Sequence, residues 1–591
     1  MERRLRFLNE GVLPLLVAAF AYVTSLAQAQ VLDSRMHHLR SGAEAEWEEF
    51  AGKTPEGKRL DFRFTGEANR EGTMLFIRQV DVKLDWNVEL NGRRLGKLFL
   101  MEYPLVHSLK VPANALRDGE NTLSILPPKE NDDIVVGDFR MAKMDATLEV
   151  DVNGPCRITV ADGQGHLAAL EATNGRPGVV YSATGKTTIK LPSGDYTVYA
   201  SRGFEYSLAT TKVNVTASQT ASAKLEIERE VETPGMVSCD THVHTFSFAK
   251  HGDATIEERM LTIAGEGLEL PVSTEHNMLV DFSEAAKKTG TDKYFTPVVG
   301  CEVTTKSGHF NAFPIQMGSR VPEFRIEHWP KLMENIRATP GAQVIVLNHP
   351  RDTHSGFCPF AETNYNSATG ENLRGFEFGF DAVELINSGA LRTDLMQVFH
   401  DWFGLLNYGY RITGVGASDS HDVSRFIVGQ GRTYIFCKDS DPARIDVQEA
   451  CANLRAGRAL VSLGLLVDMT VQGRFRVGDL ATDLPEQVEV TATVSAPKWS
   501  KADRVELYAN GVKIQETNSA KVTWKLARPA RDAHLVAIAS GPGISSPHWA
   551  IPKPYQPSSK AWNPRVFGVT NPIWLDADGD GKFTPPRLQK K

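Results

Sequence analysis

The residues in this chain best suited to metal binding or catalysis are histidines and carboxylates that follow short apolar runs between residues 236 and 421. The residues that end or adjoin these runs are His242, His244, His276, Glu302, His309, His349, Asp419 and His421. Alternate residues of a strand point to the same side, so the pairs in "THVH" and "SDSH" can each grip one metal ion or two adjacent ions. Ten of the sixteen histidines lie between Met236 and His421, which favours a metal-binding cluster over isolated core histidines.

The elements that must position these residues are short strands and helices in residues 236–465. Apolar runs alternate there with helical patterns, as expected for parallel strands joined by crossovers. "ATIEERMLTIAGEG" carries a capping box at Thr255 and Glu258, and "RTDLMQVFHDWFGLLNYG" predicts a longer helix closed by Gly409. In an α/β barrel the C-terminal strand ends converge on one mouth, so ligands far apart in sequence can meet there.

β-Sandwich modules are predicted on both sides of this α/β domain, which makes the fold class multidomain α/β plus all-β. Residues 31–152 alternate polar and apolar side chains between Asn-Gly and Asp-Gly turns, and they resemble a galactose-binding-like sandwich. Residues 153–232 resemble a small prealbumin-like or Ig-like module, residues 467–546 return to strand alternation, and residues 547–591 form a tail. The N-terminal sandwich is interpreted either as a carbohydrate-binding module or as a spacer.

Residues 1–29 have the pattern of a secretory signal peptide. A cationic start, "MERRLRF", precedes the apolar run "GVLPLLVAAFAYV" and an Ala-x-Ala site that predicts cleavage after Ala29. The alternative is an uncleaved anchor. No later segment is long and apolar enough to span a membrane, so we expect a secreted or periplasmic protein.

Charge and cysteine content exclude other classes. The net charge is −7 and no tract is densely basic, which argues against nucleic-acid binding. The six cysteines are widely spaced without a Cys-x-x-Cys pair. They therefore predict neither a disulfide framework nor a thiolate zinc site.

Five motifs of the α/β section resemble a known family. "DTHVHTFSFAKHG", "STEHN", "GCEV" with "GHFN", "NHPR" and "GASDSH" are similar, in this order, to the motifs of the PHP (polymerase and histidinol phosphatase) superfamily. More narrowly they resemble its CehA/McbA-like branch of exported metallohydrolases, over residues 235–465. The resemblance implies a distorted seven-stranded (β/α) barrel holding two or three divalent metal ions, either zinc, manganese or iron. Many relatives have aspartate where this chain has His251, which leaves the metal's identity open.

The resemblance also implies a role for each ligand. Carried over by position, the first ion would be held by His242, His244 and Asp419. The second would be held by His309 and His349, and Glu302 would bridge it to the first. The third would be held by His251, His276 and His421. Neighbouring cations lower the pKa of a bridging water and so supply hydroxide. The implied function is a metal-dependent hydrolase that cleaves a phosphoester or a carbamate, ester or amide bond. The alternative is a non-catalytic or carbohydrate-binding cell-surface protein whose metal barrel is degenerate.

Further residues are assigned to the substrate or to the surroundings of the ligands. Asp419 or His421 could carry protons for a departing group. Arg351 could bind a small-molecule substrate that is anionic or ester-like, or it could form a loop salt bridge. Asp240 and Asn277 could orient the ligand imidazoles. Glu384 is interpreted either as a support for the ligands or as a core carboxylate.

The tail contains one more candidate cation site, "DADGDGKF". Asp576, Asp578, Asp580 and Gly581 match the first positions of a calcium loop, but Arg587 occupies the position where an EF-hand has glutamate. The two interpretations left open are an acidic turn and an isolated calcium site.

Overall fold

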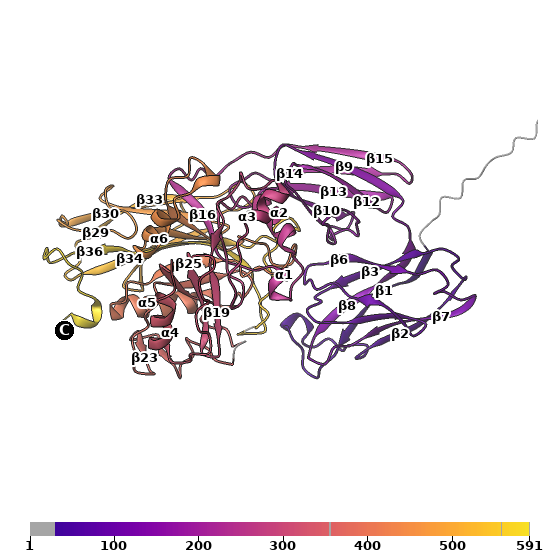
Figure 1. The fold of residues 1–591 in the computed structure, drawn as a ribbon, viewed down its shortest axis with the longest axis horizontal. Helices are drawn as coiled ribbons and strands as arrows, with labels where there is room; N and C mark the ends of the chain where they lie inside the picture. The colour runs from indigo at the N-terminus through magenta and orange to yellow at the C-terminus, as the bar shows by residue number, and fades with distance from the viewer. Residues whose placement is uncertain (1–29, 354–355, 557, 590–591) are drawn as a thin grey trace, which may run out of the picture.

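β-Strands make up most of the regular structure of the chain, and they are arranged in successive modules with few helices (Figure 1). The structure is a computed structural model that describes residues 30–353, 356–556 and 558–589. The predicted signal peptide, residues 1–29, lies outside the described residues. Within them, no helix is long and apolar enough to cross a membrane.

The N-terminal module is a β-sandwich of two four-stranded sheets, with strand orders β1-β8-β3-β6 and β2-β7-β4-β5. Its strands are β1 (Gln30–Arg40), β2 (Leu60–Gly66), β3 (Thr73–Val80), β4 (Asn87–Leu90), β5 (Arg93–Lys97), β6 (Leu105–Val111), β7 (Gly119–Leu126) and β8 (Asp133–Ala142). Trp86 and Phe139 are fully buried in its core. Asn91 and Gly92 both have positive φ, 53° and 78°, in the β4–β5 turn, as the Asn-Gly pair predicts.

The second module is a smaller sandwich with its own core. One sheet has the order β11-β10-β13-β14 and the other β12-β9-β15. The strands are β9 (Ala146–Val152), β10 (Cys156–Asp162), β11 (Val179–Ser182), β12 (Lys186–Leu191), β13 (Gly194–Ser201), β14 (Ala209–Val215) and β15 (Thr220–Leu225). Ile158, Ile189 and Val198 have no exposed surface, because alternate side chains of both sheets face the space between them.

The α/β section contains two large sheets and the two-stranded sheet β22-β23. Its strands are β16 (Met236–Val243), β17 (Leu270–Ser273), β18 (Val298–Val299), β19 (Cys301–Thr305), β20 (Gly308–Phe313), β21 (Val344–Leu347), β22 (Tyr365–Asn366), β23 (Glu371–Asn372), β24 (Ala382–Asn387), β25 (Thr413–Ala417), β26 (Arg432–Phe436) and β27 (Ala459–Leu463). Its helices are α1 (Phe246–Ala249), α2 (Ile256–Gly265), α3 (Ser283–Thr289), α4 (Trp329–Arg337), α5 (Leu395–Tyr408) and α6 (Val447–Arg455). One sheet has the order β19-β20-β21-β24-β25, and the other includes β18-β17-β16-β26-β27.

This topology corrects the expected regular (β/α) alternation. The pairs β16–β26, β26–β27, β19–β20 and β20–β21 are antiparallel, whereas β16–β17, β21–β24 and β24–β25 are parallel. Only Lys306 and Ser307 separate β19 from β20, a connection too short for the crossover that parallel strands need. Isolated bridges join Val243 to Ser420 and His276 to Glu302, so the two sheets curl around a shared interior.

The C-terminal sandwich continues one sheet of the α/β section. Strand β27 pairs with β35, and the sheet runs on through β34 and β31 to β32. The strands of this region are β28 (Leu466–Val471), β29 (Leu480–Ala481), β30 (Gln487–Ser495), β31 (Arg504–Ala509), β32 (Val512–Thr517), β33 (Lys521–Ala527), β34 (Ala533–Pro542), β35 (Arg565–Thr570) and β36 (Ile573–Leu575). Two of them, β35 and β36, therefore lie in the residues that the sequence assigns to the tail.

A segment without helix or strand, residues 547–564, connects β34 to β35; we call it the strap, of which residue 557 is not described. The strap contacts the N-terminal sandwich, where Glu48 N donates to Lys560 O at 2.8 Å. Lys553 Nζ also bonds Asp81 Oδ1 at 2.9 Å. The strap therefore brings the N-terminal sandwich and the α/β section together around their common boundary.

Candidate metal centre

The predicted ligands His242 and His244 lie at the carboxyl end of β16, a strand whose residues are all buried. Their side chains project to the same side because they alternate along the strand, and their ring centroids are 4.9 Å apart. Both residues have 0% of their surface exposed. Such complete burial is costly for two imidazoles unless their nitrogens have partners.

The other predicted imidazoles gather around this pair. Ring centroids are separated by 4.5 Å for His244–His276, 4.1 Å for His244–His421, 4.2 Å for His251–His421, 5.8 Å for His242–His349 and 5.1 Å for His309–His349. These residues come from the ends of β16, β21 and β25, from the loops after β17 and α1, and from β20. The structure thus brings all seven predicted histidines into one cluster, which we call the histidine cluster together with Glu302 and Asp419.

Glu302 occupies the centre of the histidine cluster. Its Oε1 is 3.5 Å from His242 Nε2 and 3.6 Å from His349 Nε2, and it is also 3.1 Å from His309 Nδ1. Its Oε2 lies 3.6 Å from His244 Nε2. A carboxylate with each oxygen facing different imidazoles has the arrangement of a bridge between two cations.

Asp419 closes the cluster from β25. Its Oδ1 lies 3.2 Å from His242 Nε2 and 3.4 Å from His244 Nε2. Its backbone has a positive φ of 52°, and its N–H donates to His242 O at 2.9 Å. The bond to His242 O holds Asp419 in this left-handed conformation, which is uncommon for a residue other than glycine.

Three subsets of these side chains are compact enough to hold a cation, since their ligand atoms lie within 4.8 Å of one another. The subsets are His242, His244 and Asp419; His242, Glu302 and His349; and His244, His276 and His421. Each contains two or three imidazoles, and two contain a carboxylate as well. Nitrogen and oxygen donors of this kind suit zinc, manganese or iron.

The fit to cations is tested by polar atoms that have no partner. His242 Nε2, both ring nitrogens of His244, and His421 Nε2 are buried and form no hydrogen bond. Leaving a buried polar group unsatisfied costs about 1–3 kcal/mol. Four such nitrogens at the point where carboxylates converge are what a metal-binding site requires of its free ligands.

Glu384 supports the cluster through one imidazole and one backbone amide. Its Oε1 lies 2.7 Å from His242 Nδ1, and its Oε2 accepts the backbone N–H of His349 at 2.6 Å. This contact favours the first of the two interpretations of Glu384. A carboxylate on Nδ1 fixes the ring orientation and directs Nε2 toward the cluster.

Asp240 and Asn277 act on backbone positions rather than on the imidazoles. Asp240 accepts backbone N–H groups from His242 at 3.1 Å, Ser418 at 3.0 Å and Gly429 at 2.8 Å. Asn277 Oδ1 accepts the N–H of Thr304 at 2.9 Å. Asp240 therefore links the carboxyl end of β16 to the residue that follows β25 through hydrogen bonds.

Two further residues that support the histidine cluster were not predicted from the sequence. Arg259 of α2 is fully buried and donates to His244 O and Ser420 O, each at 2.9 Å. The sequence feature that could have identified Arg259 is a charged residue among the apolar positions of a short helix. Tyr555 of the strap bonds Asp352, whose Oδ2 is 3.4 Å from His349 Nδ1. No local pattern marks Tyr555, which is about two hundred residues away in the chain.

Arg351 does not face the cluster. Its Nε and Nη2 donate to the two oxygens of Asp401, each at 2.7 Å. This is the loop salt bridge that the sequence left open as the alternative to substrate binding. The bidentate pair occupies the Nε and Nη2 edge of the guanidinium.

Burial and neighbouring charges move the pKa values of the cluster in opposite directions. Burial and the nearby imidazoles of His421 and His276 lower the pKa of His244. Burial also opposes protonation of His242, but Asp419, Glu384 and Glu302 outweigh it and raise its pKa. Against the same burial effect, Glu302 raises the pKa of His349 to about 9.

The histidine cluster forms the floor of a cavity of about 1190 Å³. The N-terminal sandwich contributes a wall, which consists of Glu46, Lys83, Leu84, Leu100, Glu130 and Asn131. Phe324, Phe426 and Tyr555 also line the cavity. Because two modules and the strap enclose it, this cavity is larger than the barrel mouth alone would provide.

The Asp-rich turn of the tail has a different local structure. Asp576 Oδ1 accepts the N–H of Gly579 at 2.7 Å, and its Oδ2 accepts that of Gly581 at 2.9 Å. Asp576, Asp578 and Asp532 have oxygens within 4.8 Å of one another. Arg587 packs over the Tyr408 ring at 3.5 Å, so this position supplies no glutamate-like ligand.

Comparison with known proteins identifies no family for this chain. No protein-family model and no curated protein matches it. Similar solved structures include a glycosyl hydrolase family 2 member from Bacteroides cellulosilyticus, with 9% identity, 92% of this chain and 97% of that chain covered, and a TM-score of 0.17. They also include β-glucuronidases from Parabacteroides merdae (10% identity, 93% and 86% covered, TM-score 0.17) and Bacteroides uniformis (10% identity, 86% and 78% covered, TM-score 0.19).

These findings correct the assignment made from the sequence motifs. Neither a family model nor a curated protein supports the PHP resemblance, and the similar structures named above are glycoside hydrolases rather than PHP metallohydrolases. The predictions of a PHP superfamily member and of a metal-dependent hydrolase acting on phosphoester, carbamate, ester or amide bonds are therefore wrong. At TM-scores below 0.2, the similarities carry no argument about what this chain itself binds.

Proposed function

We propose that this chain is a ligand-binding protein that holds two or three divalent cations in the histidine cluster and uses them to bind a small, oxygen-rich molecule of the carbohydrate class. The observation that carries the proposal is the set of four buried imidazole nitrogens without partners. The carboxylates of Asp419 and Glu302 lie 3.2–3.6 Å from the Nε2 atoms of His242 and His244, so a cation placed there would bind imidazoles and carboxylates together. The expected metals are zinc, manganese or iron, because the donors are imidazoles and carboxylates.

The geometry supports a particular distribution of the cations. One would take His242, His244 and Asp419, and a neighbour would take His349 with Glu302 as the bridge. A third would rest on His276 and His421, because His244 is shared with the first subset. With two or three protein ligands each, the cations keep open positions toward the cavity, unlike closed structural sites.

The cavity wall favours an oxygen-rich ligand. Open positions on hard or borderline cations bind hydroxyl and carboxylate oxygens. Phe324 and Phe426 offer apolar faces for a sugar ring, and Asn131 offers an amide group for its hydroxyls. The N-terminal sandwich contributes to ligand binding as a wall of this cavity, rather than as an independent module.

Calorimetry on metal-stripped protein tests the proposal. We expect manganese or zinc to bind at two or three sites per chain, and a uronate such as galacturonate to bind only after the metal. His244→Ala should remove at least one metal site, because His244 belongs to two subsets. His400→Ala, which changes an exposed histidine on α5, is the matched control and should leave metal binding intact. Uronate binding of equal strength with and without metal would contradict the proposed ligand role.

A further inference from the structure

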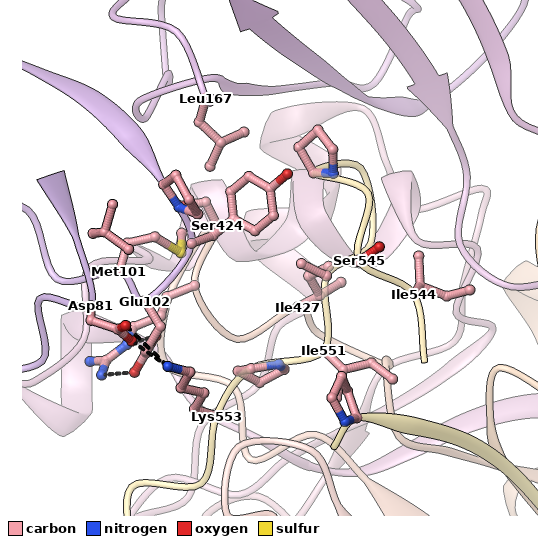
Figure 2. A pocket seen from close by; sticks show the side chains of 18 of the residues that line it. Asp81, Met101, Glu102, Leu167, Ser424, Ile427, Ile544, Ser545, Ile551 and Lys553 are labelled. Atoms are coloured by element: carbon pink, nitrogen blue, oxygen red, sulfur yellow. Dashed lines mark hydrogen bonds and ion pairs between the residues drawn. The ribbon is translucent and has the colours of Figure 1, made fainter. Parts of the chain in front are cut away.

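We propose that a second cavity, at the junction of the modules, binds a small uncharged ligand that is largely apolar and carries one hydrogen-bonding group. This junction cavity has a volume of about 310 Å³ (Figure 2). Its walls come from the N-terminal sandwich, the second module, the loop after β25, and the C-terminal region that includes the strap. The inference does not rest on the metal centre, which occupies a separate cavity.

The apolar walls come from segments far apart in the sequence. Met101, Leu167, Ile427 and Ile551 line the cavity, and they are 5%, 2%, 2% and 7% exposed. Figure 2 shows these side chains around one space together with Ile544. Ligand sites of this size are typically lined by apolar groups with a few polar ones, and they occur preferentially between domains.

The charged groups at one end of the junction cavity already have partners. Lys553 Nζ lies 2.9 Å from Asp81 Oδ1, and Arg425 Nη2 lies 2.6 Å from Glu102 Oε1. Figure 2 draws the contacts of Lys553 with Asp81 beside the apolar walls. A charged ligand would have to displace one of these partly buried pairs, so the cavity favours an uncharged one.

Ser424 provides the hydrogen-bonding position. Its side chain lines the cavity and is 3% exposed, and its Oγ has no partner among the described residues. A buried hydroxyl without a partner is uncommon in a protein interior. A ligand hydroxyl or carbonyl placed against the apolar walls would satisfy it. The two observations, apolar walls and one unpartnered hydroxyl, together define the ligand class.

Binding of 2-naphthol tests this proposal, because the probe is uncharged at neutral pH, fluorescent, apolar over two rings, and carries one hydroxyl. A fluorescence titration should show one saturable site on the wild-type chain. Ser424→Ala should weaken binding by about three- to tenfold, the effect of one hydrogen bond. Ser462→Ala is the matched control, because Ser462 Oγ is also buried and unpartnered but does not line the cavity. It should leave binding unchanged.

Two blocking variants guard against a folding defect. Leu167→Trp fills the cavity from the second module, and Ile544→Trp fills it from the half-buried C-terminal side. Either variant that keeps the wild-type melting temperature should abolish 2-naphthol binding. Phe324→Ala, in the wall of the metal cavity, should not affect it. Absence of saturable binding to the wild type, or undiminished binding to a folded blocking variant, would overturn the proposal.

Discussion

The histidine cluster and the Asp-rich turn of the tail are both candidate cation sites by residue type and spacing, but their donor atoms are in opposite states. In the cluster, both ring nitrogens of His244 are buried without partners. In the turn, Asp576 accepts backbone N–H groups from Gly579 and Gly581 with separate oxygens. Sequence spacing therefore identifies potential ligands, whereas hydrogen bonds from the surrounding backbone determine whether their side-chain atoms are free to bind a cation.

The different states follow from where each group lies. The cluster residues end strands of two sheets that curl around a shared interior, where the ring nitrogens of His244 meet no hydrogen-bond partner. The turn folds back on its own carboxylates, as short Asp-rich turns do. Asp532 joins them and accepts the N–H of Ala577 at 2.8 Å. The turn thus needs no cation to hold its shape.

The largest expected effect comes from Glu302→Ala. Glu302 faces His242, His244, His309 and His349, so its loss removes the bridge between cations. We expect the variant to lose about one or more bound metal ions per chain, measured by mass spectrometry of the purified protein. Asp578→Asn, the equivalent loss of charge in the tail turn, should leave the metal content unchanged. Equal losses in both variants would remove the distinction between the two regions.

A smaller effect is expected from Glu384→Gln. The glutamine keeps the size of the side chain but weakens the contact at 2.7 Å with His242 Nδ1. Loss of such a supporting carboxylate typically lowers metal affinity 10- to 100-fold. Competition with a chromogenic chelator measures it. Affinity equal to that of the wild type would show that Glu384 is only a core carboxylate.

Acidification should weaken metal binding to the cluster. Neighbouring carboxylates raise the pKa of His242, and Glu302 and Asp419 raise that of His349 to about 9, although burial opposes both shifts. His349 therefore carries a proton at pH 7 in the metal-free protein, and metal binding there must release it. Affinity should fall as the pH is lowered from 9. Calorimetry in buffers of different ionisation enthalpy should detect proton release, and its absence would contradict the ligand assignment.

A few-fold loss of metal affinity is expected from Tyr555→Phe. This substitution removes the hydroxyl that bonds Asp352 and so loosens the carboxylate beside His349 Nδ1. The chelator competition used for Glu384 measures this effect too. Tyr408→Phe, on α5, is the control. Loss of metal affinity in the control alone would argue against a role for the strap at the cluster.

The smallest effect is expected from adding calcium, which should bind weakly or not at all at the Asp-rich turn and so change the melting temperature little. Because backbone N–H groups already occupy Asp576, adding millimolar calcium should change the melting temperature of metal-loaded protein no more in the wild type than in Asp578→Asn. Differential scanning fluorimetry measures both. A calcium-dependent rise in the wild type only would assign a cation site to the turn.

Local features of the fold could be predicted from the sequence because they depend on neighbours in the chain. The capping box of Thr255 and Glu258 is confirmed at the start of α2, and Gly409 closes α5 with a φ of 118°. The regular alternation of strands and helices was wrong, since hairpins such as β19–β20 connect several strands directly. A buried hairpin strand has the same apolar pattern as a parallel one.

The candidate ligands could also be predicted, since strand ends were visible in the apolar runs. Their supports could not, apart from Glu384, Asp240 and Asn277. The strap places Tyr555 near His349 through long-range contacts that no sequence period records. The role of Arg351 could not be predicted, because its guanidinium pairs with Asp401, which is fifty residues away in the chain. Family resemblance in short motifs gave the ligand set, but the comparisons contradict the activity inferred from it.

Anomalous X-ray scattering from crystals of protein purified without chelators tests the central claim most directly. We expect two or three anomalous peaks within about 2.0–2.3 Å of cluster ligands. One should lie between His242, His244 and Asp419, and another beside Glu302 and His349. The result that would contradict the account is a histidine cluster without an anomalous peak, in which waters satisfy the ring nitrogens of His242 and His244.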